Sequence, residues 1–246
     1  MSALNGKIAL VTGGSRGMGA AIAKRLAREG AYVAITYATE GDKAAEVISS
    51  IKTAGGRGIA IQADNRNAEA VTAAIDTVAA AEGHINILVN NAGIIDARPI
   101  SELTLEDFDR TVDINVRGVF VATKSAVAHM PDGGRVITIG SNLASQVPWP
   151  GISLYALSKS ALIGFTRGLA RDLGERAITA NIVHPGSTDT DMNPASGDMA
   201  DAQRAQMAIP RYGDPADVAS LVAWLAGPEA RSVTGAEYVI DGGTNA

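Results

Sequence analysis

Short apolar runs alternate along the chain with longer stretches in which apolar residues recur at helical spacing. The runs are nearly continuous, which is typical of strands buried on both faces of a parallel sheet. Strands are expected over 8–11, 32–37, 58–64, 85–89, 135–139, 178–183 and 233–243. Helices are expected over 20–30, 42–54, 67–81, 101–130, 153–174 and 215–225. The alternation predicts one α/β domain spanning 1–246, a doubly wound parallel sheet with helices on both faces.

Composition and charge exclude several classes of function. The chain has 246 residues, 46% of them hydrophobic, and a net charge of −5. The acidic balance argues against a nucleic-acid partner. Three widely spaced histidines and no cysteine offer no pattern for a metal site. The start lacks a signal-peptide pattern and no apolar run reaches membrane-spanning length, so we expect a cytoplasmic protein with no membrane partner.

A glycine-rich segment, 12–19, joins the first strand to the first helix. Its Gly13, Gly17 and Gly19 have the spacing G-x-x-x-G-x-G. A strand, a glycine turn and a helix together place the free N–H groups of the helix start against a phosphate, and glycine lets the ligand approach closely. The segment therefore predicts a dinucleotide site, with a purely structural turn as the alternative.

The end of the second strand bears on the choice between NAD(H) and NADP(H). A carboxylate there would hold the ribose hydroxyls of NAD and repel a 2′-phosphate. Tyr37 and Ala38 occupy this place, and acidic residues come only later, at Glu40 and Asp42. Arg16, within the glycine segment, can reach a 2′-phosphate. NADP(H) is therefore favoured over NAD(H), unless Arg16 is only a solvated loop cation.

Polar residues follow the next two strands. Asp64 comes just past the third strand and either binds an adenine amino group or caps the helix that follows. The fourth strand ends in Asn90 and Asn91, followed by small residues up to Gly93 that allow a ring to pass. Asn115 interrupts an apolar helical stretch, where it must be hydrogen-bonded. It satisfies a distorted backbone turn, holds a water, or does both.

Tyr155 and Lys159 are four residues apart on an expected helix, so their side chains share one face. An ammonium beside a phenol lowers the phenol pKa, and such a pair can give and take a proton near neutral pH. An exposed helix face is the alternative, because Tyr-x-x-x-Lys is a common pattern. Ser141 follows the fifth strand, at the sheet edge where ligands of α/β proteins bind.

The segment 187–212 is polar and rich in methionine, which is typical of a mobile lid over a site. If Met192, Met199 and Met207 line this lid, the pocket favours an apolar or bulky substrate. His184, just before the segment, lies beside the expected cofactor region but has no obvious partner.

Across the whole chain, the sequence resembles the short-chain dehydrogenase/reductase family, of the type that includes 3-oxoacyl-carrier-protein reductases and bacterial ketoreductases. The motifs that carry this resemblance are, in order, Thr12-Gly-x-x-x-Gly17-x-Gly19, Asn90-Asn91-Ala92-Gly93, Asn115, Ser141, Tyr155-x-x-x-Lys159 and Pro185-Gly186. The resemblance implies a Rossmann-like fold and the reversible, NADPH-dependent reduction of a ketone to an alcohol.

The resemblance also implies roles for individual residues. Tyr155 would be the general acid, and Ser141 would orient the carbonyl oxygen. Lys159 would hold the nicotinamide ribose and lower the Tyr155 pKa, and Asn115 would position a water that relays protons. The implied cofactor contacts are Gly13, Ser15, Arg16, Gly17, Met18, Gly19, Tyr37, Asp64, Asn65, Asn91, Ala92, Gly93, Tyr155, Lys159, Pro185, Gly186 and Thr188.

Two features qualify this expectation. The spacing between Ser141 and Tyr155 is one residue longer than is usual in the family, and the loop around Trp149 would absorb the difference. The C-terminal part resembles a bacterial branch that includes a cyclic-di-GMP-binding protein, so a nucleotide-binding regulatory protein with little or no catalysis is the alternative.

Self-association is also expected. The helices over 101–130 and 153–174 carry more small and apolar residues than two exposed helices need. The family resemblance implies a homotetramer built on these two helices, with a dimer as the second choice.

Overall fold

The apolar runs form one sheet in the computed structural model, which describes residues 2–246. The strands are β1 (Ile8–Val11), β2 (Tyr32–Tyr37), β3 (Arg57–Gln62), β4 (Ile87–Asn90), β5 (Arg135–Ile139), β6 (Thr179–Pro185) and β7 (Glu237–Ile240). Within residues 2–246 they make a seven-stranded sheet in the order β3-β2-β1-β4-β5-β6-β7, and each neighbouring pair is parallel. The fold class predicted from the sequence is confirmed.

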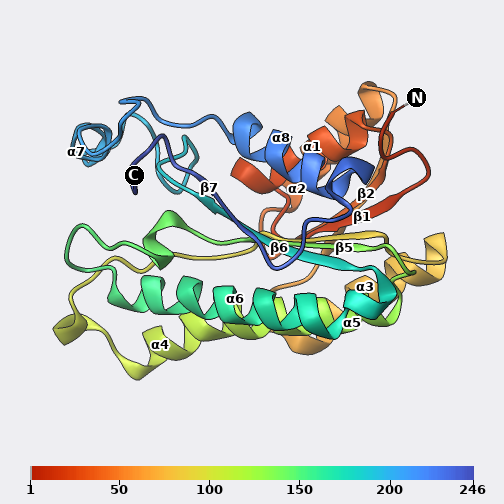
Figure 1. Ribbon diagram of the computed structural model, residues 1–246, viewed down its shortest axis with the longest axis horizontal. Helices are drawn as coiled ribbons and strands as arrows, with labels where there is room; N and C mark the ends of the chain where they lie inside the picture. The colour runs from red at the N-terminus through yellow and green to blue at the C-terminus, as the bar shows by residue number, and fades with distance from the viewer. Residues whose placement is uncertain (1) are drawn as a thin grey trace.

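Helices cover both faces of the sheet, as Figure 1 shows. On one face lie α1 (Gly17–Arg28), α2 (Gly41–Thr53) and α8 (Pro215–Ala226). On the other lie α3 (Ala68–Glu82), α4 (Leu105–Val112), α5 (Gly118–Ala128) and α6 (Ser153–Asp172). The shorter elements are α7 (Ala200–Arg204), the π-turn η2 (Asp113–Arg117) and the 3-10 turns η1 (Ile100–Glu102), η3 (Asn142–Ala144), η4 (Gly174–Arg176) and η5 (Pro228–Ala230). None of the helices across residues 2–246 is long and apolar enough to cross a membrane.

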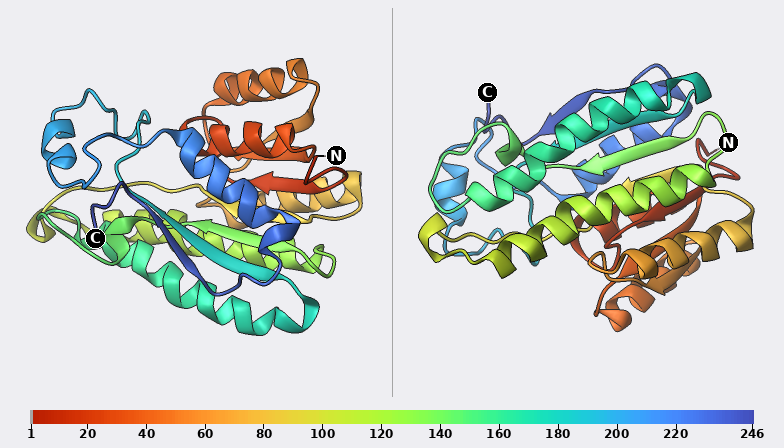
Figure 2. Two further views of the ribbon diagram at one scale, coloured as in Figure 1. Left: turned by 45° about the horizontal axis from the view of Figure 1, so that its top comes forward. Right: turned by 90° about the horizontal axis from the view of Figure 1, so that it is seen from below.

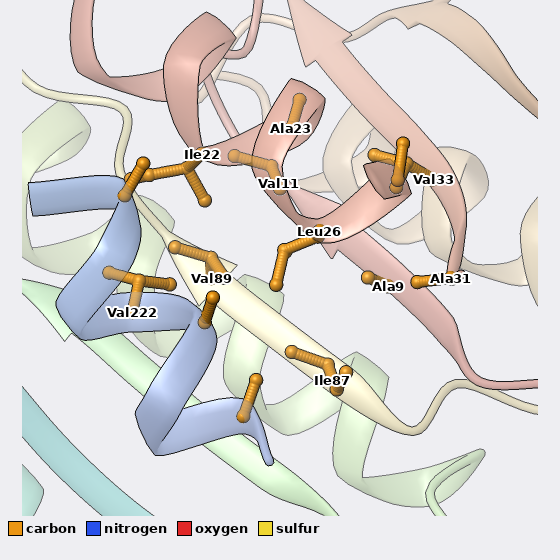
Figure 3. Packing of buried hydrophobic residues seen from close by; sticks show 14 of the residues in the cluster. Ala9, Val11, Ile22, Ala23, Leu26, Ala31, Val33, Ile87, Val89 and Val222 are labelled. Atoms are coloured by element: carbon orange, nitrogen blue, oxygen red, sulfur yellow. The ribbon is translucent and has the colours of Figure 1, made fainter. Parts of the chain in front are cut away.

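Successive residues of each central strand pack into different cores, because side chains alternate between the faces of a sheet. Val11 of β1 contributes to the core beneath α1 and α8, where Figure 3 shows Leu26 and Val222 directed at the strands. Leu10, its neighbour, lies in the opposite core with Ile75 of α3. Leu26 is fully buried, which stabilises the fold by about 2 kcal/mol. Burial on both faces explains why the strands are apolar throughout.

The chain changes direction across the sheet at β1. It first moves from β1 outward to β2 and β3, and α3 then returns it to β4 on the other side of β1. Connections that diverge in this way leave a crevice at the carboxyl ends of the two strands, where ligands of such sheets bind. Two further views show α7 and the C-terminus gathered at one end of the molecule (Figure 2).

The helix expected over 101–130 is broken in the structure. α4 begins only at Leu105, because Thr104 and Asp107 form a capping box: Asp107 N–H donates to the Thr104 hydroxyl, and the Asp107 carboxylate accepts from Thr104 N–H. The π-turn then separates α4 from α5 and contains Asn115, which is fully buried. A π-turn inserts one extra residue into a helix and is common at functional sites.

Candidate active site

A cavity of about 260 Å³ opens at the carboxyl ends of the central strands. Its walls come from the glycine segment, the ends of β2 to β5, helix α6 and the start of the 187–212 segment. The sequence-predicted residues that line it are Gly13, Ser15, Arg16, Gly17, Met18, Gly19, Tyr37, Asp64, Asn65, Asn91, Ala92, Gly93, Tyr155 and Lys159. Most of the predicted cofactor contacts are therefore brought together.

Glycine is required at two positions of the turn between β1 and α1. Gly13 has φ = 64°, and a Cβ there would lie 2.9 Å from Cα of Ala92. A Cβ on Gly19 would lie 2.3 Å from the Gly13 carbonyl oxygen and 2.5 Å from the Asn91 amide nitrogen. The Asn91 amide donates to the carbonyls of Thr12 and Gly13, which ties the turn to the end of β4.

The first turn of α1 faces the same cavity, through Gly17, Met18 and Gly19. Within residues 2–246, no side chain caps this helix and no acidic residue lies in its first turn. Its free N–H groups and the positive end of the helix dipole therefore point to an anionic ligand.

At the far end of the cavity, Asp64 and Asn65 follow β3. The Asp64 carboxylate is paired with Arg66 at 2.6 Å, and the Arg66 side chain holds the pKa of Asp64 below its usual value. α3 is capped by Asn67 instead, whose side-chain oxygen accepts from Ala70 N–H at 3.0 Å. The helix-cap alternative for Asp64 is therefore wrong, and adenine binding stays a prediction.

Asn65 offers a hydrogen-bond donor that the protein does not use. Its side chain is buried, and its amide nitrogen has no partner among residues 2–246. A buried donor without a partner costs about 1–3 kcal/mol. This nitrogen lies close to Gly118 at the start of α5, where a Cβ would be 2.8 Å from it.

Two cations border the cavity near the end of β2. Arg16 lies 3.6 Å and Lys43 lies 3.3 Å from one carboxylate oxygen of Asp191, which belongs to the 187–212 segment. Lys43 also lies 3.6 Å from Glu40. Sequence reasoning found Arg16 but missed Lys43, because no motif marks the first turn of α2. Its position a few residues after the end of β2 was the signal that could have found it.

Lys159 brings a positive charge into the interior of the site. Its side chain is buried, and Nζ donates to the Ile139 carbonyl at 2.9 Å. Burial penalises the ammonium and lowers the pKa of Lys159 to about 8. Nζ lies 5.8 Å from the centroid of the Tyr155 ring, as the helical spacing predicts.

The pKa of the Tyr155 phenol shifts in the direction opposite to the one expected from the sequence. Burial raises the pKa of Tyr155, and the hydroxyl of Ser141 opposes this effect only in part. The lowering by Lys159 that the sequence predicts is not among the causes of this shift, and the cost of removing a phenolate from water sets its direction. Tyr155 is thus a protonated phenol at neutral pH, which is the form that can donate a proton.

Ser141 lies just beyond β5, and its hydroxyl oxygen accepts a hydrogen bond from the main chain. Its Oγ accepts from Leu143 N–H at 3.2 Å and so caps η3. Because Oγ serves there as an acceptor, its own proton is available for a ligand. Ser141 and Tyr155 line a second cavity, of about 400 Å³, which also contains Pro185, Gly186 and Thr188.

Asn115 lies behind this surface and lines neither cavity. Its side-chain oxygen accepts from Ile94 N–H, and its amide donates to the Ile94 carbonyl and to Ser158 Oγ. A Cβ on Gly93 would lie 3.3 Å from both Asn115 Oδ1 and Lys159 Nζ. The distorted-turn role is therefore supported, while the water-holding role stays a prediction.

The two cavities meet at Tyr155, which lines both, together with Met18, Gly140, Thr190 and Met192. The arrangement resembles one long cleft with a phosphate-binding end and an apolar end. Among residues 2–246, no group of three His, Cys, Asp or Glu side chains is placed to hold a metal ion. His184, for which the sequence suggested no partner, contacts the main chain of Ser141.

Comparisons with known proteins agree with this geometry. The family model described as enoyl-(acyl carrier protein) reductase matches residues 13–245. A short chain dehydrogenase from Burkholderia cenocepacia, solved in complex with NADP, is 59% identical with a TM-score of 0.98, and the match covers 99% of this chain and 100% of that one.

One similar protein is named for a different role. The cyclic-di-GMP-binding biofilm dispersal mediator protein of Escherichia coli is 46% identical over 242 residues, or 98% of each chain. The crystal structure of BdcA in complex with NADPH is 45% identical with a TM-score of 0.92, and the match covers 98% of this chain and 95% of that one.

The buried ammonium of Lys159 predicts how stability depends on pH. Between pH 8 and 10.5 the unfolded chain holds more protons on this residue than the folded chain does, so the free energy of unfolding rises with pH. Relative to Lys159→Met, the wild type should gain about 2 kcal/mol between pH 8 and pH 10, measured by urea unfolding. The exposed Lys124 is the control, since Lys124→Met should give no such pH-dependent difference. A constant difference for Lys159→Met would contradict the buried charge.

Proposed function

The chain belongs to the short-chain dehydrogenase/reductase family, and on that premise we propose that it reduces a ketone reversibly to an alcohol with NADPH, in the cytoplasm. The observation that carries the proposal is the meeting of Ser141, Tyr155 and Lys159 where the two cavities join. One cavity has the features of a nucleotide site and the other those of a substrate pocket.

The residues present fit NADP(H). The glycine turn and the first turn of α1 suit the pyrophosphate, and Gly13 and Gly19 leave the close approach that a Cβ would fill. Asp64 and Asn65 line the end of the cavity where we place the adenine. Arg16 and Lys43 supply the two charges that a 2′-phosphate needs, where NAD-binding proteins place a carboxylate. The NADP and NADPH complexes of the solved relatives support the same choice.

NADPH supplies a hydride to the carbonyl carbon when it is bound. Tyr155 then gives its phenolic proton to the carbonyl oxygen, which completes the alcohol. Ser141 donates a hydrogen bond to the same oxygen, on which negative charge develops. A donor placed in this way stabilises the transition state more than the ground state, by about 3 kcal/mol.

Lys159 and Asn115 return a proton to Tyr155 after it has protonated the carbonyl oxygen. Because its pKa is about 8, Lys159 can release and regain a proton near neutral pH. We assign it the return of a proton to Tyr155 and the positioning of the nicotinamide ribose. Asn115 lies beside Lys159 across Gly93, and we assign it the water that connects Lys159 to solvent.

The second cavity favours a neutral, apolar or bulky carbonyl compound. Among the described residues, no charged side chain lines it. Its walls include Ile95, Leu143, Trp149, Met192 and Met199. A carboxylate or phosphate moved from water into such a pocket would lose hydration without gaining a charged partner.

Two structural proposals accompany this activity. The 187–212 segment acts as a lid, since Asp191 closes onto Arg16 and Lys43 while Met192 lines both cavities. The protein assembles as a homotetramer through α4, α5 and α6, which expose Leu105, Phe108, Phe120 and Leu157.

A regulatory protein that binds cyclic di-GMP is the second candidate, because the Escherichia coli protein named for that role matches 98% of the chain. The complete set of Ser141, Tyr155 and Lys159 favours catalysis. Tight binding of cyclic di-GMP in calorimetry, with no turnover of any ketone, would favour the regulatory role.

The proton donor is tested by Tyr155→Phe, which removes only the hydroxyl. NADPH oxidation with a ketone panel should fall at least about a hundredfold, while NADPH affinity is retained. Turnover that survives the substitution would contradict the role given to Tyr155.

The cofactor preference is tested by Arg16→Ala and Lys43→Ala. Each should weaken NADPH about tenfold and leave NADH nearly unchanged, because only NADPH carries the 2′-phosphate. Nicotinamide fluorescence titration measures both affinities. Arg28→Ala, at the opposite end of α1, is the control. Equal losses for the two cofactors would remove the phosphate assignment.

The neutral pocket is tested with an aryl 2-oxo ester and the corresponding 2-oxo carboxylate. The ester should have a kcat/KM about tenfold higher or more, since burial of the unpaired carboxylate is costly. Equal values for the pair would show that the pocket accepts a charge, without affecting the reductase activity itself.

A further inference from the structure

The main chain of Ser141 is held by a side chain rather than by the sheet. The ladder between β5 and β6 ends at the pair Ile139 and Val183. Pro185 follows on β6 and has no N–H with which to extend it. His184, between Val183 and Pro185, instead brings its imidazole to Ser141.

The contact between His184 and Ser141 is specific. Nδ1 of His184 lies 2.9 Å from the Ser141 carbonyl oxygen, and Ser141 N–H donates to Nδ1 at 3.2 Å. Ser141 is extended, with φ = −164° and ψ = 147°, so its N–H and C=O face the ring together. A Cβ on Gly140 would lie 2.5 Å from Nδ1, so glycine at this position leaves the space that the imidazole fills.

The other ring nitrogen faces a carboxylate. Nε2 of His184 lies 3.2 Å from Oε2 of Glu237 on β7. The second carboxylate oxygen of Glu237 accepts from Arg167 of α6 at 2.6 Å, which holds the carboxylate in place. His184 is 1% exposed, so a bare Nε2 lone pair facing this carboxylate would be strongly unfavourable. The contact lacks hydrogen-bond geometry, since Nε2 has no hydrogen-bond partner among residues 2–246, and Glu237 favours a proton on Nε2 through its charge alone.

We infer that His184 is a positioning residue for Ser141, and that the charge of Glu237 favours the His184 tautomer this requires. The inference rests on the reductase activity proposed above. The imidazole holds the Ser141 main chain after the sheet ladder has ended, while Leu143 N–H orients its Oγ. Together these contacts direct the Ser141 hydroxyl at the substrate oxygen beside Tyr155. Small displacements of such a group cost about tenfold to a hundredfold in rate.

A double-mutant cycle separates positioning from a general structural role. His184→Leu should lower kcat about tenfold or more, with little change in NADPH affinity. His184→Asn, which keeps a polar group near the position of Nδ1, should recover part of the loss. In a Ser141→Ala background, His184→Leu should have no further effect on kcat. Losses that multiply in the double variant would overturn the inference.

Two further variants serve as an alternative to His184→Leu and as a control. Glu237→Gln keeps the shape of the side chain and serves if His184→Leu fails to fold, and its loss of kcat should also vanish in the Ser141→Ala background. His129→Leu is the control, since His129 pairs with Asp76 at the surface and should leave kcat unchanged.

Imidazole nitrogen NMR tests the contact without any activity, and the chain has only three histidines to assign. The His184 spectrum should show a proton on Nε2, and Glu237→Gln should shift both His184 Nε2 and the Ser141 amide. A bare Nε2, or a Ser141 amide that does not respond, would overturn the inference. If the wild-type protein turns over no ketone, the proposed function is refuted. The contact between His184 and Ser141 is then tested by the NMR measurement alone.

Discussion

The ammonium of Lys159 is the constraint on which the rest of the site depends. A charge in a buried position is tolerated only with partners, and Lys159 has the Ile139 carbonyl at the end of β5. That contact ties α6, which packs mainly against β6, to the end of β5. The same helix places Tyr155 one turn away. Gly93 and the π-turn around Asn115 leave room for the lysine on its other side. One costly group thus sets the positions of α6, β5 and the turn before α5.

The sheet brings backbone groups and side chains from distant parts of the chain together at its carboxyl edge. The turn after β1 supplies backbone donors, β2 and β3 end beside the adenosine end of the cavity, and the segments after β5 and β6 supply hydroxyls and the apolar pocket. Apart from Lys159, the charged groups of the cavity lie around its far end, where Arg16, Lys43 and Asp191 meet. The polar end suits a phosphate-bearing cofactor and the uncharged end a neutral carbonyl compound.

Local patterns predicted the parallel sheet and most of the cavity lining, because strand periodicity, glycine spacing and helical spacing are short-range properties. The start of α4 at Leu105 also follows from a local pattern, the Thr104–Asp107 capping box, which the spacing of apolar residues does not reveal. The pKa direction of Tyr155 and the partners of His184 were not predictable from local patterns. Each depends on contacts between residues far apart in sequence, such as His184 with Ser141 and Glu237. Asp64 illustrates the limit: the sequence left two roles open, and the Asn67 cap, visible only in the structure, removed one.

Isotope transfer tests the central claim most directly. NADPH that carries deuterium on the reactive face of C4 would be incubated with the protein and a neutral ketone, and the alcohol analysed by mass spectrometry and NMR. The account predicts one deuterium on the carbinol carbon of the product, with the hydroxyl proton drawn from solvent through Tyr155. Alcohol without deuterium from either face of C4, or no alcohol across a broad panel despite tight NADPH binding, would contradict it.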